Sequence, residues 1–101
     1  MKPSITIMYC PKCNWLLRSA YMAQELLTTF AEDIKSVTLQ PSELSGDFKI
    51  YVDDLIILDR KHYGGFPEIK ALKQLVRDII NPTKNLGHSD KKSTEEINTQ
   101  Q

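Results

Sequence analysis

The sequence predicts an α/β fold in which four strands form a mixed sheet and two helices pack on it, in the chain order β-α-β-β-β-α. Short runs rich in β-branched and aromatic residues indicate the strands, and two longer runs with apolar residues every three or four positions indicate the helices. Turn residues separate these runs. The 101 residues are enough for one domain, which we expect to span residues 1–82, followed by a polar, mobile tail over residues 83–101.

The first strand and the first helix follow directly from the N-terminal third of the chain. Residues 4–9 are β-branched and aromatic and predict a buried strand. Pro11 then turns the chain into a helix that we expect to run from about Cys13 to about Ala31. Its apolar stripe consists of Leu16, Ala20, Ala23, Leu27 and Phe30, and it is widened on one flank by Trp15, Met22 and Leu26.

The remaining elements complete the sheet and add the second helix. Residues 34–40 alternate apolar and polar side chains and predict a second strand, while residues 48–52 and 55–58 predict a hairpin. Residues 60–66 read as a loop, and Pro67 is suited to the first position of a helix that stops before Pro82. A right-handed parallel crossover and an antiparallel hairpin give the sheet order 2-1-3-4.

Charge and hydropathy exclude several classes of function. The 13 basic and 13 acidic residues balance to a net charge of zero, so nothing suggests the clustered basic face that nucleic-acid binding needs. The longest aliphatic run, at residues 55–58, is too short to cross a bilayer. No signal peptide is visible before the first strand. We therefore expect a cytoplasmic protein that binds neither nucleic acid nor membrane.

The two cysteines carry the strongest functional signal. They form the motif Cys10-Pro11-Lys12-Cys13, a spacing that about one random pairing in 50 would give. A start-of-helix position supplies unpaired N–H groups that favour the reactive thiolate, and this spacing lets one sulfur resolve a mixed disulfide formed by the other. A structural disulfide is a poor alternative because it would close a tiny loop in a reducing compartment. The motif predicts Cys10 and Cys13 as catalytic residues.

Zinc binding is the competing interpretation of this pair. A structural zinc site needs four ligands, and only His62 and His88 remain as nitrogen donors. They have no ligand-like spacing from the cysteines or from each other. We therefore expect no metal.

Four other residues are candidates for substrate binding. Trp15 follows the motif and either forms an apolar platform for a substrate or belongs to the core. Gly64, Gly65 and Phe66 precede the second helix, where the glycine N–H groups suit a carboxylate. The alternative is that this turn serves only to start the helix. Arg18 lies within reach of the motif, although a solvated helix arginine is the simpler interpretation.

Three segments also resemble a known family. The strand–motif–helix junction at residues 9–18, the segment at residues 59–68 and the segment at residues 86–90 are similar to the bacterial branch of the selenoprotein W-like family, which carries Cys-x-x-Cys. This resemblance covers about residues 4–90. It implies a thioredoxin-like fold and thiol–disulfide chemistry with glutathione as co-substrate, without a tightly bound cofactor.

Two points remain open within this resemblance. Thioredoxins carry a cis-proline opposite their cysteines, whereas here that position falls at residues 45–47 and the nearest proline is Pro41. By thioredoxin analogy Cys10 attacks, but selenium-bearing relatives place selenium at the position of Cys13. The predicted function is a glutathione-linked thiol–disulfide oxidoreductase acting on glutathione or protein thiols. The alternative is a redox-responsive protein-binding module that does not turn over. The sequence does not indicate an oligomeric state.

Overall fold

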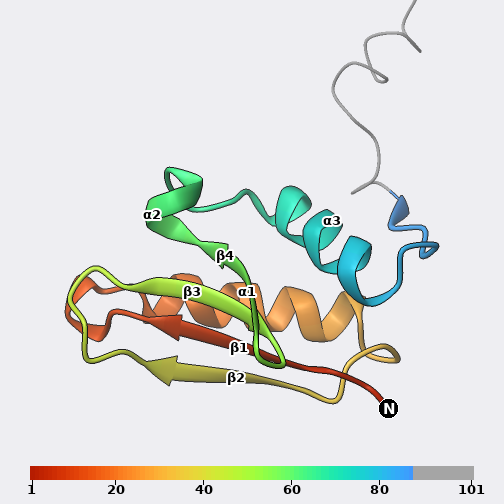
Figure 1. The fold of residues 1–101 in the computed structure, drawn as a ribbon, viewed down its shortest axis with the longest axis horizontal. Coiled ribbons are helices and arrows are strands. Elements are labelled where there is room, and N and C mark those ends of the chain that lie inside the picture. The colour runs from red at the N-terminus through yellow and green to blue at the C-terminus, as the bar shows by residue number, and fades with distance from the viewer. Residues whose placement is uncertain (88–101) are drawn as a thin grey trace, which may run out of the picture.

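The computed structural model describes residues 1–87, and its strands and helices follow the predicted order with two short helices added (Figure 1). The strands are β1 (Ser4–Tyr9), β2 (Ser36–Pro41), β3 (Phe48–Val52) and β4 (Leu55–Asp59). The helices are the 3-10 helix η1 (Pro11–Cys13) and the α-helices α1 (Leu16–Thr29), α2 (Arg60–Tyr63) and α3 (Ile69–Ile80).

The four strands form one mixed sheet in the order β2-β1-β3-β4, which confirms the predicted topology. Central β1 lies parallel to β2 and antiparallel to β3, so that Ile7 is opposite Leu39 on one side and Ile50 on the other. β4 pairs antiparallel with β3 at the edge. A parallel pair needs a crossover connection, and here α1 provides it. The start of α1 therefore lies beside the end of β1, where the cysteines are.

The core lies on the face of the sheet that the helices cover. Residues of β1 alternate in exposure: Ile5 and Ile7 are fully buried, whereas Thr6 and Met8 are only half-buried on the other face. Figure 1 shows α1 running behind the strands with α3 next to it. Both helices contribute to one buried cluster with the sheet, through Leu26, Phe30, Leu72 and Val76.

The predicted apolar stripe of α1 is partly wrong. Leu16 and Leu27, which the spacing places on the buried face, are 51% and 46% exposed. Met22 and Leu26, predicted only to widen the stripe, are buried. The buried face is rotated toward them because α1 packs against α3 as well as against β1 and β2.

Two predicted boundaries in the second half of the chain also differ. Residues 60–63 form the short helix α2, whose first turn is capped because the Asp59 side chain accepts a hydrogen bond from the Lys61 N–H. The last helix begins at Ile69 and not at Pro67. Glu68 keeps an extended backbone with φ −66° and ψ 152°, which prevents the helix from starting earlier.

The chain continues along the domain after α3. The Lys84 ammonium lies 3.1 Å from the Asp33 carboxylate, and Leu86 packs against the core cluster. The rest of the expected tail, residues 88–101, lies outside the described residues. Within residues 1–87, none of the helices combines the length and apolar character that crossing a membrane requires.

Candidate functional site

Cys10 and Cys13 lie where β1 passes into η1, and they are joined as a disulfide. Cys10 keeps the extended backbone of the strand, and Pro11 starts the 3-10 turn. The Cys13 N–H donates to the Cys10 carbonyl oxygen at 3.3 Å. The two Cα atoms are thereby 5.4 Å apart, a separation typical of disulfides. The turn itself brings the two sulfur atoms together.

The long helix begins at Leu16 and not at about Cys13, where the sequence predicts its start. η1 ends at Asn14, whose φ of 60° is in the left-handed region, and α1 begins only at Leu16. Asparagine tolerates this conformation better than most residues, but a right-handed helix cannot pass through it. The cysteines therefore lie in a separate 3-10 turn that precedes α1.

The two cysteines differ in exposure. Cys10 is 1% exposed, whereas Cys13 is partly exposed. Exchange requires that an outside thiolate reach one sulfur of the disulfide. The difference in burial makes Cys13 the more accessible of the two.

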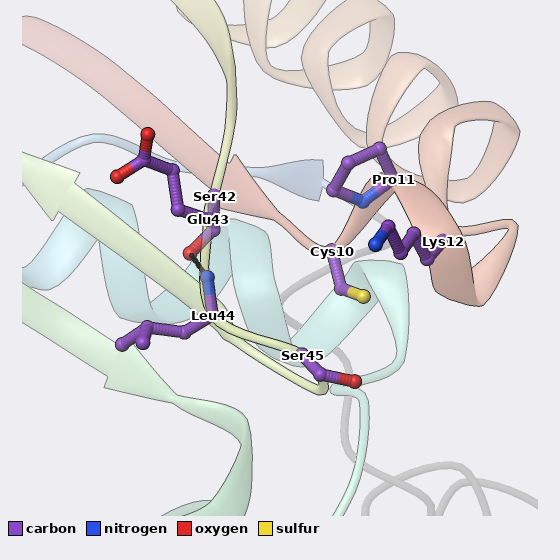
Figure 2. Close-up of a pocket in the computed structure, with 7 residues that line it drawn as sticks. All are labelled: Cys10, Pro11, Lys12, Ser42, Glu43, Leu44 and Ser45. Atoms are coloured by element: carbon purple, nitrogen blue, oxygen red, sulfur yellow. Dashed lines mark hydrogen bonds between the residues drawn. The ribbon is translucent and has the colours of Figure 1, made fainter.

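A hollow of about 300 Å³ opens beside the disulfide, with Cys10 at its floor. Figure 2 shows Pro11 and Lys12 on one side of Cys10 and residues 42–45 on the other. These residues belong to the segment that joins β2 to β3. The segment before β3 therefore faces the cysteines, as the sequence predicts for the position that carries a cis-proline in thioredoxins.

Asp47 anchors this segment. Its side chain is 9% exposed and accepts hydrogen bonds from the Ser42 hydroxyl at 2.7 Å and the Lys49 ammonium at 2.6 Å. Burial disfavours the charged carboxylate, but the two hydrogen bonds outweigh it and lower the pKa of Asp47 below its usual 3.8. The same contact raises the pKa of Lys49. The sequence pattern indicates the strand here but not this role, because the partner Ser42 lies across a turn.

Three aromatic rings from distant parts of the chain meet next to the motif. Trp15, Phe48 and Phe66 are arranged edge to face, with centroids 6.4 Å apart for Trp15–Phe48 and 4.9 Å apart for the two pairs that include Phe66. Trp15 and Phe66 are partly buried and pack against the core. The structure thus brings together two predicted substrate-binding residues, in direct contact with each other.

Two arginines stack on these rings. The Arg18 guanidinium carbon lies 4.2 Å from the Phe66 centroid, and that of Arg60 lies 4.8 Å from the centroids of both Trp15 and Phe66. Arg18 is exposed, as the sequence suggests, and it also contacts the Phe66 ring. No sequence signal identifies Arg60, because its contacts depend on how α2 docks.

Gly64 and Gly65 form the turn at the end of α2. Their φ values of 94° and 148° require glycine or a strained residue. Both N–H groups donate to the Arg60 carbonyl oxygen, at 2.9 and 3.1 Å. The predicted role of these amides in binding a carboxylate needs free N–H groups, and in this structure the turn already uses them. Phe66 is the residue of this turn that reaches the aromatic cluster.

Within the described part of the chain, no three His, Cys, Asp or Glu side chains gather in a way that could hold a metal ion. His88, one of the two candidate nitrogen donors, lies outside that part. The expected absence of zinc stays a prediction, and elemental analysis of the purified protein tests it.

Comparison with known proteins places the chain in a family. The model of the Rdx family matches residues 4–78. A crystal structure of a selenoprotein W-related protein from Vibrio cholerae is 52% identical, with a TM-score of 0.76 over 80% of this chain and 100% of that chain. A crystal structure from Bordetella parapertussis is 51% identical, with a TM-score of 0.74 over 77% of this chain and 98% of that chain.

A search of curated proteins found no match. The family match and the two structures confirm the resemblance and the thioredoxin-like fold drawn from the sequence. The chain therefore belongs to the Rdx family, and its paired Cys10 and Cys13 indicate a redox protein of the selenoprotein W-related kind.

Proposed function

We propose that this protein is a thiol–disulfide oxidoreductase of a reducing, cytoplasmic compartment, with glutathione as its co-substrate. The observation that supports this most is the disulfide itself, in which Cys10 is buried and Cys13 is partly exposed. A bridge with a sequence separation of 3 closes a very short loop. It therefore constrains the unfolded chain little, and a purely stabilising role explains it poorly.

In the proposed cycle Cys13 reacts with the substrate. Its thiolate attacks a disulfide R–S–S–R, forms the mixed disulfide Cys13–S–S–R and releases RS⁻, which takes up a proton. Cys10 then loses its proton, attacks the Cys13 sulfur and displaces the second RS⁻, closing the internal disulfide. Two electrons pass from the protein to the substrate. Two glutathione molecules restore the dithiol in the reverse order and leave as glutathione disulfide.

A redox-responsive binding module is the second candidate. Apolar side chains follow the motif on the outer side of α1, where Leu17 is 82% exposed and Tyr21 is 51% exposed. Such a surface suits a protein that docks when the cysteine pair changes state. In this case the pair reacts once and does not cycle.

Turnover separates the two candidates. Purified protein is incubated with a small disulfide, glutathione, glutathione reductase and NADPH, and NADPH consumption above the uncatalysed rate is followed. An oxidoreductase consumes many equivalents per chain, and Cys13→Ser abolishes this activity. Consumption that stops at one equivalent would favour the binding module. The Cys10→Ser variant is the matched control, because it keeps Cys13 and loses only the resolving thiol.

A further inference from the structure

Two positively charged side chains, Arg18 and Arg60, stack on the same aromatic ring beside the motif. The guanidinium carbons of Arg18 and Arg60 lie 4.2 and 4.8 Å from the same Phe66 centroid, so they are separated by no more than those two distances combined. Within residues 1–87, neither arginine forms an ion pair. Two carboxylates that are adjacent in sequence to Arg60 and Phe48 have other partners, since Asp59 caps α2 and Asp47 binds Lys49.

The Arg60 side chain adds a second observation. Its Nε is buried and has no hydrogen-bond partner among residues 1–87. Buried N–H groups in native proteins nearly always have a partner. The Arg60 guanidinium carbon lies 4.8 Å from the centroids of both Trp15 and Phe66, so the rings hold this side chain beside the motif. A carboxylate that reaches a guanidinium group can accept two hydrogen bonds from it at once.

A surface hollow next to the disulfide makes Arg18 accessible. It has a volume of about 370 Å³ and is lined by Asn14, Trp15, Leu17, Arg18 and Tyr21. It begins at the residue that directly follows Cys13, the more exposed of the two cysteines. A small molecule in this hollow therefore has a cation and an apolar surface within reach of the reacting sulfur.

We infer that Arg18 and Arg60, held on Phe66 and Trp15, form a subsite that binds the carboxylate of a small thiol or disulfide substrate. The rings fix both side chains in advance, so that little rotamer freedom is lost when the anion binds. This inference rests on the proposed function and names its substrate class: disulfides that carry a carboxylate close to sulfur. Glutathione disulfide belongs to this class.

Three small disulfides of different charge test the inference. Reduced protein is mixed with anionic 3,3′-dithiodipropionate, neutral bis(2-hydroxyethyl) disulfide and cationic cystamine, and oxidation is followed by acid quench and mass spectrometry. Each rate is divided by the rate of the same disulfide with free dithiothreitol, which removes the intrinsic reactivity. We expect a normalised preference of about tenfold for the anionic over the neutral disulfide, the size of one charge-assisted hydrogen-bond pair.

Substitutions then show which residues cause the preference for the anionic disulfide. Arg18→Gln and Arg60→Gln should each remove most of it, because the rate with the anionic disulfide falls far more than the rate with the neutral one. Arg60→Lys keeps the charge but loses the planar fork, and it should behave nearly like Arg60→Gln. Lys61→Gln is the matched control, since Lys61 is exposed and does not stack on the rings. Thermal unfolding of each variant confirms that it is folded.

Two results would overturn the inference in distinguishable ways. Equal normalised rates for the three disulfides, or a preference lost in Lys12→Gln but kept in both arginine variants, would mean that the stacked arginines are not a carboxylate subsite. The redox function would survive either of these results. No reaction with any disulfide, the neutral one included, would overturn the proposed function itself.

Discussion

The two sides of the disulfide are built differently. On the side of Cys10, a buried cysteine lies against a connecting segment that the Asp47 carboxylate holds with two hydrogen bonds. On the side of Cys13, a partly exposed cysteine adjoins an open hollow, exposed apolar side chains and two stacked arginines. On the Cys10 side, the Asp47 carboxylate accepts hydrogen bonds from Ser42 and Lys49. On the Cys13 side, the buried Nε of Arg60 has no hydrogen-bond partner among residues 1–87.

This difference shows which features folding alone explains. The Cys10 side gains stability from burial and from satisfied hydrogen bonds, as an ordinary core does. On the Cys13 side, Leu17 is 82% exposed and, within residues 1–87, neither Arg18 nor Arg60 forms an ion pair, so burial and charge pairing do not explain these side chains. These features make sense on a surface that meets a substrate. Substitutions on the two sides should therefore differ in whether they affect stability or exchange.

Removing one cysteine at a time should show that Cys13 reacts with glutathione disulfide and that Cys10 does not. After treatment with glutathione disulfide, Cys10→Ser should carry one glutathione on Cys13, because that thiol is accessible and lacks its resolving partner. Cys13→Ser should remain almost unmodified, because Cys10 is 1% exposed. Mass spectrometry of tryptic peptides measures both adducts. A Cys13→Ser variant that is modified as readily as Cys10→Ser would contradict the division.

Truncating Phe66 should affect both stability and exchange. Because the ring is only partly buried, Phe66→Ala should lower the free energy of unfolding by about 2–3 kcal/mol, somewhat less than for a fully buried phenylalanine. Exchange with glutathione disulfide should slow because both arginines lose their support, while the reduction potential stays nearly unchanged. Urea unfolding and stopped-flow mixing measure the two effects.

Phe66→Leu is the matched variant for this test. It keeps most of the apolar volume but removes the aromatic face on which Arg18 and Arg60 stack. It should retain most of the stability and still react slowly with glutathione disulfide. Reaction at the wild-type rate in both variants would show that Phe66 serves only as part of the core.

Neutralising Asp47 should weaken the Cys10 side by a smaller amount that depends on pH. Hydrogen bonds lower the pKa of Asp47 below 3.8 in the folded state. Its contribution is therefore present above that pH and is lost as the pH falls through the folded-state value. Asp47→Asn should lower the free energy of unfolding by about 1–3 kcal/mol at pH 7, and the gap to the wild type should narrow as the pH falls below 3.8. A gap independent of pH, measured by urea unfolding, would argue against this role of the charge.

The smallest effect is expected far from the disulfide. The pKa of Asp33 is lowered mainly by its contact with Lys84, and Asn81 also donates a hydrogen bond to this carboxylate. Asp33→Asn should lower the free energy of unfolding by about 1 kcal/mol and leave exchange with glutathione disulfide unchanged. An altered exchange rate would show that the site responds to general loosening of the fold. Stopped-flow mixing and urea unfolding on the same preparation compare the two quantities.

Most of the fold follows from local patterns in the sequence. Alternation in residues 48–52 and the β-branched run at residues 4–9 identify strands, and the crossover rule then fixes the observed sheet order. The break at Asn14 escapes this reasoning because the apolar stripe begins only at Trp15 and Leu16, so the pattern does not locate the residue at which the helix starts. The rotated face of α1 escapes it as well, since that face depends on where α3 packs.

The candidate site is predicted only at its centre. Cys10 and Cys13 are evident from their spacing, and Trp15 and Phe66 do meet beside them. Arg60 is missed because a four-residue helix has no periodic pattern that would show which side chains it turns inward. The hydrogen bond that the Gly64 N–H donates to the Arg60 carbonyl oxygen is not evident from the sequence, because this acceptor is in place only when α2 forms.

The reduction potential of the Cys10–Cys13 pair tests whether this disulfide exchanges with thiols or is a structural bridge. The protein is equilibrated in buffers of reduced and oxidised glutathione, and the fraction of disulfide is measured by alkylation and mass spectrometry. We expect a reversible two-electron transition at about −180 to −270 mV, the range of proteins that exchange disulfides. A potential below about −300 mV, typical of inert structural bridges, would contradict it.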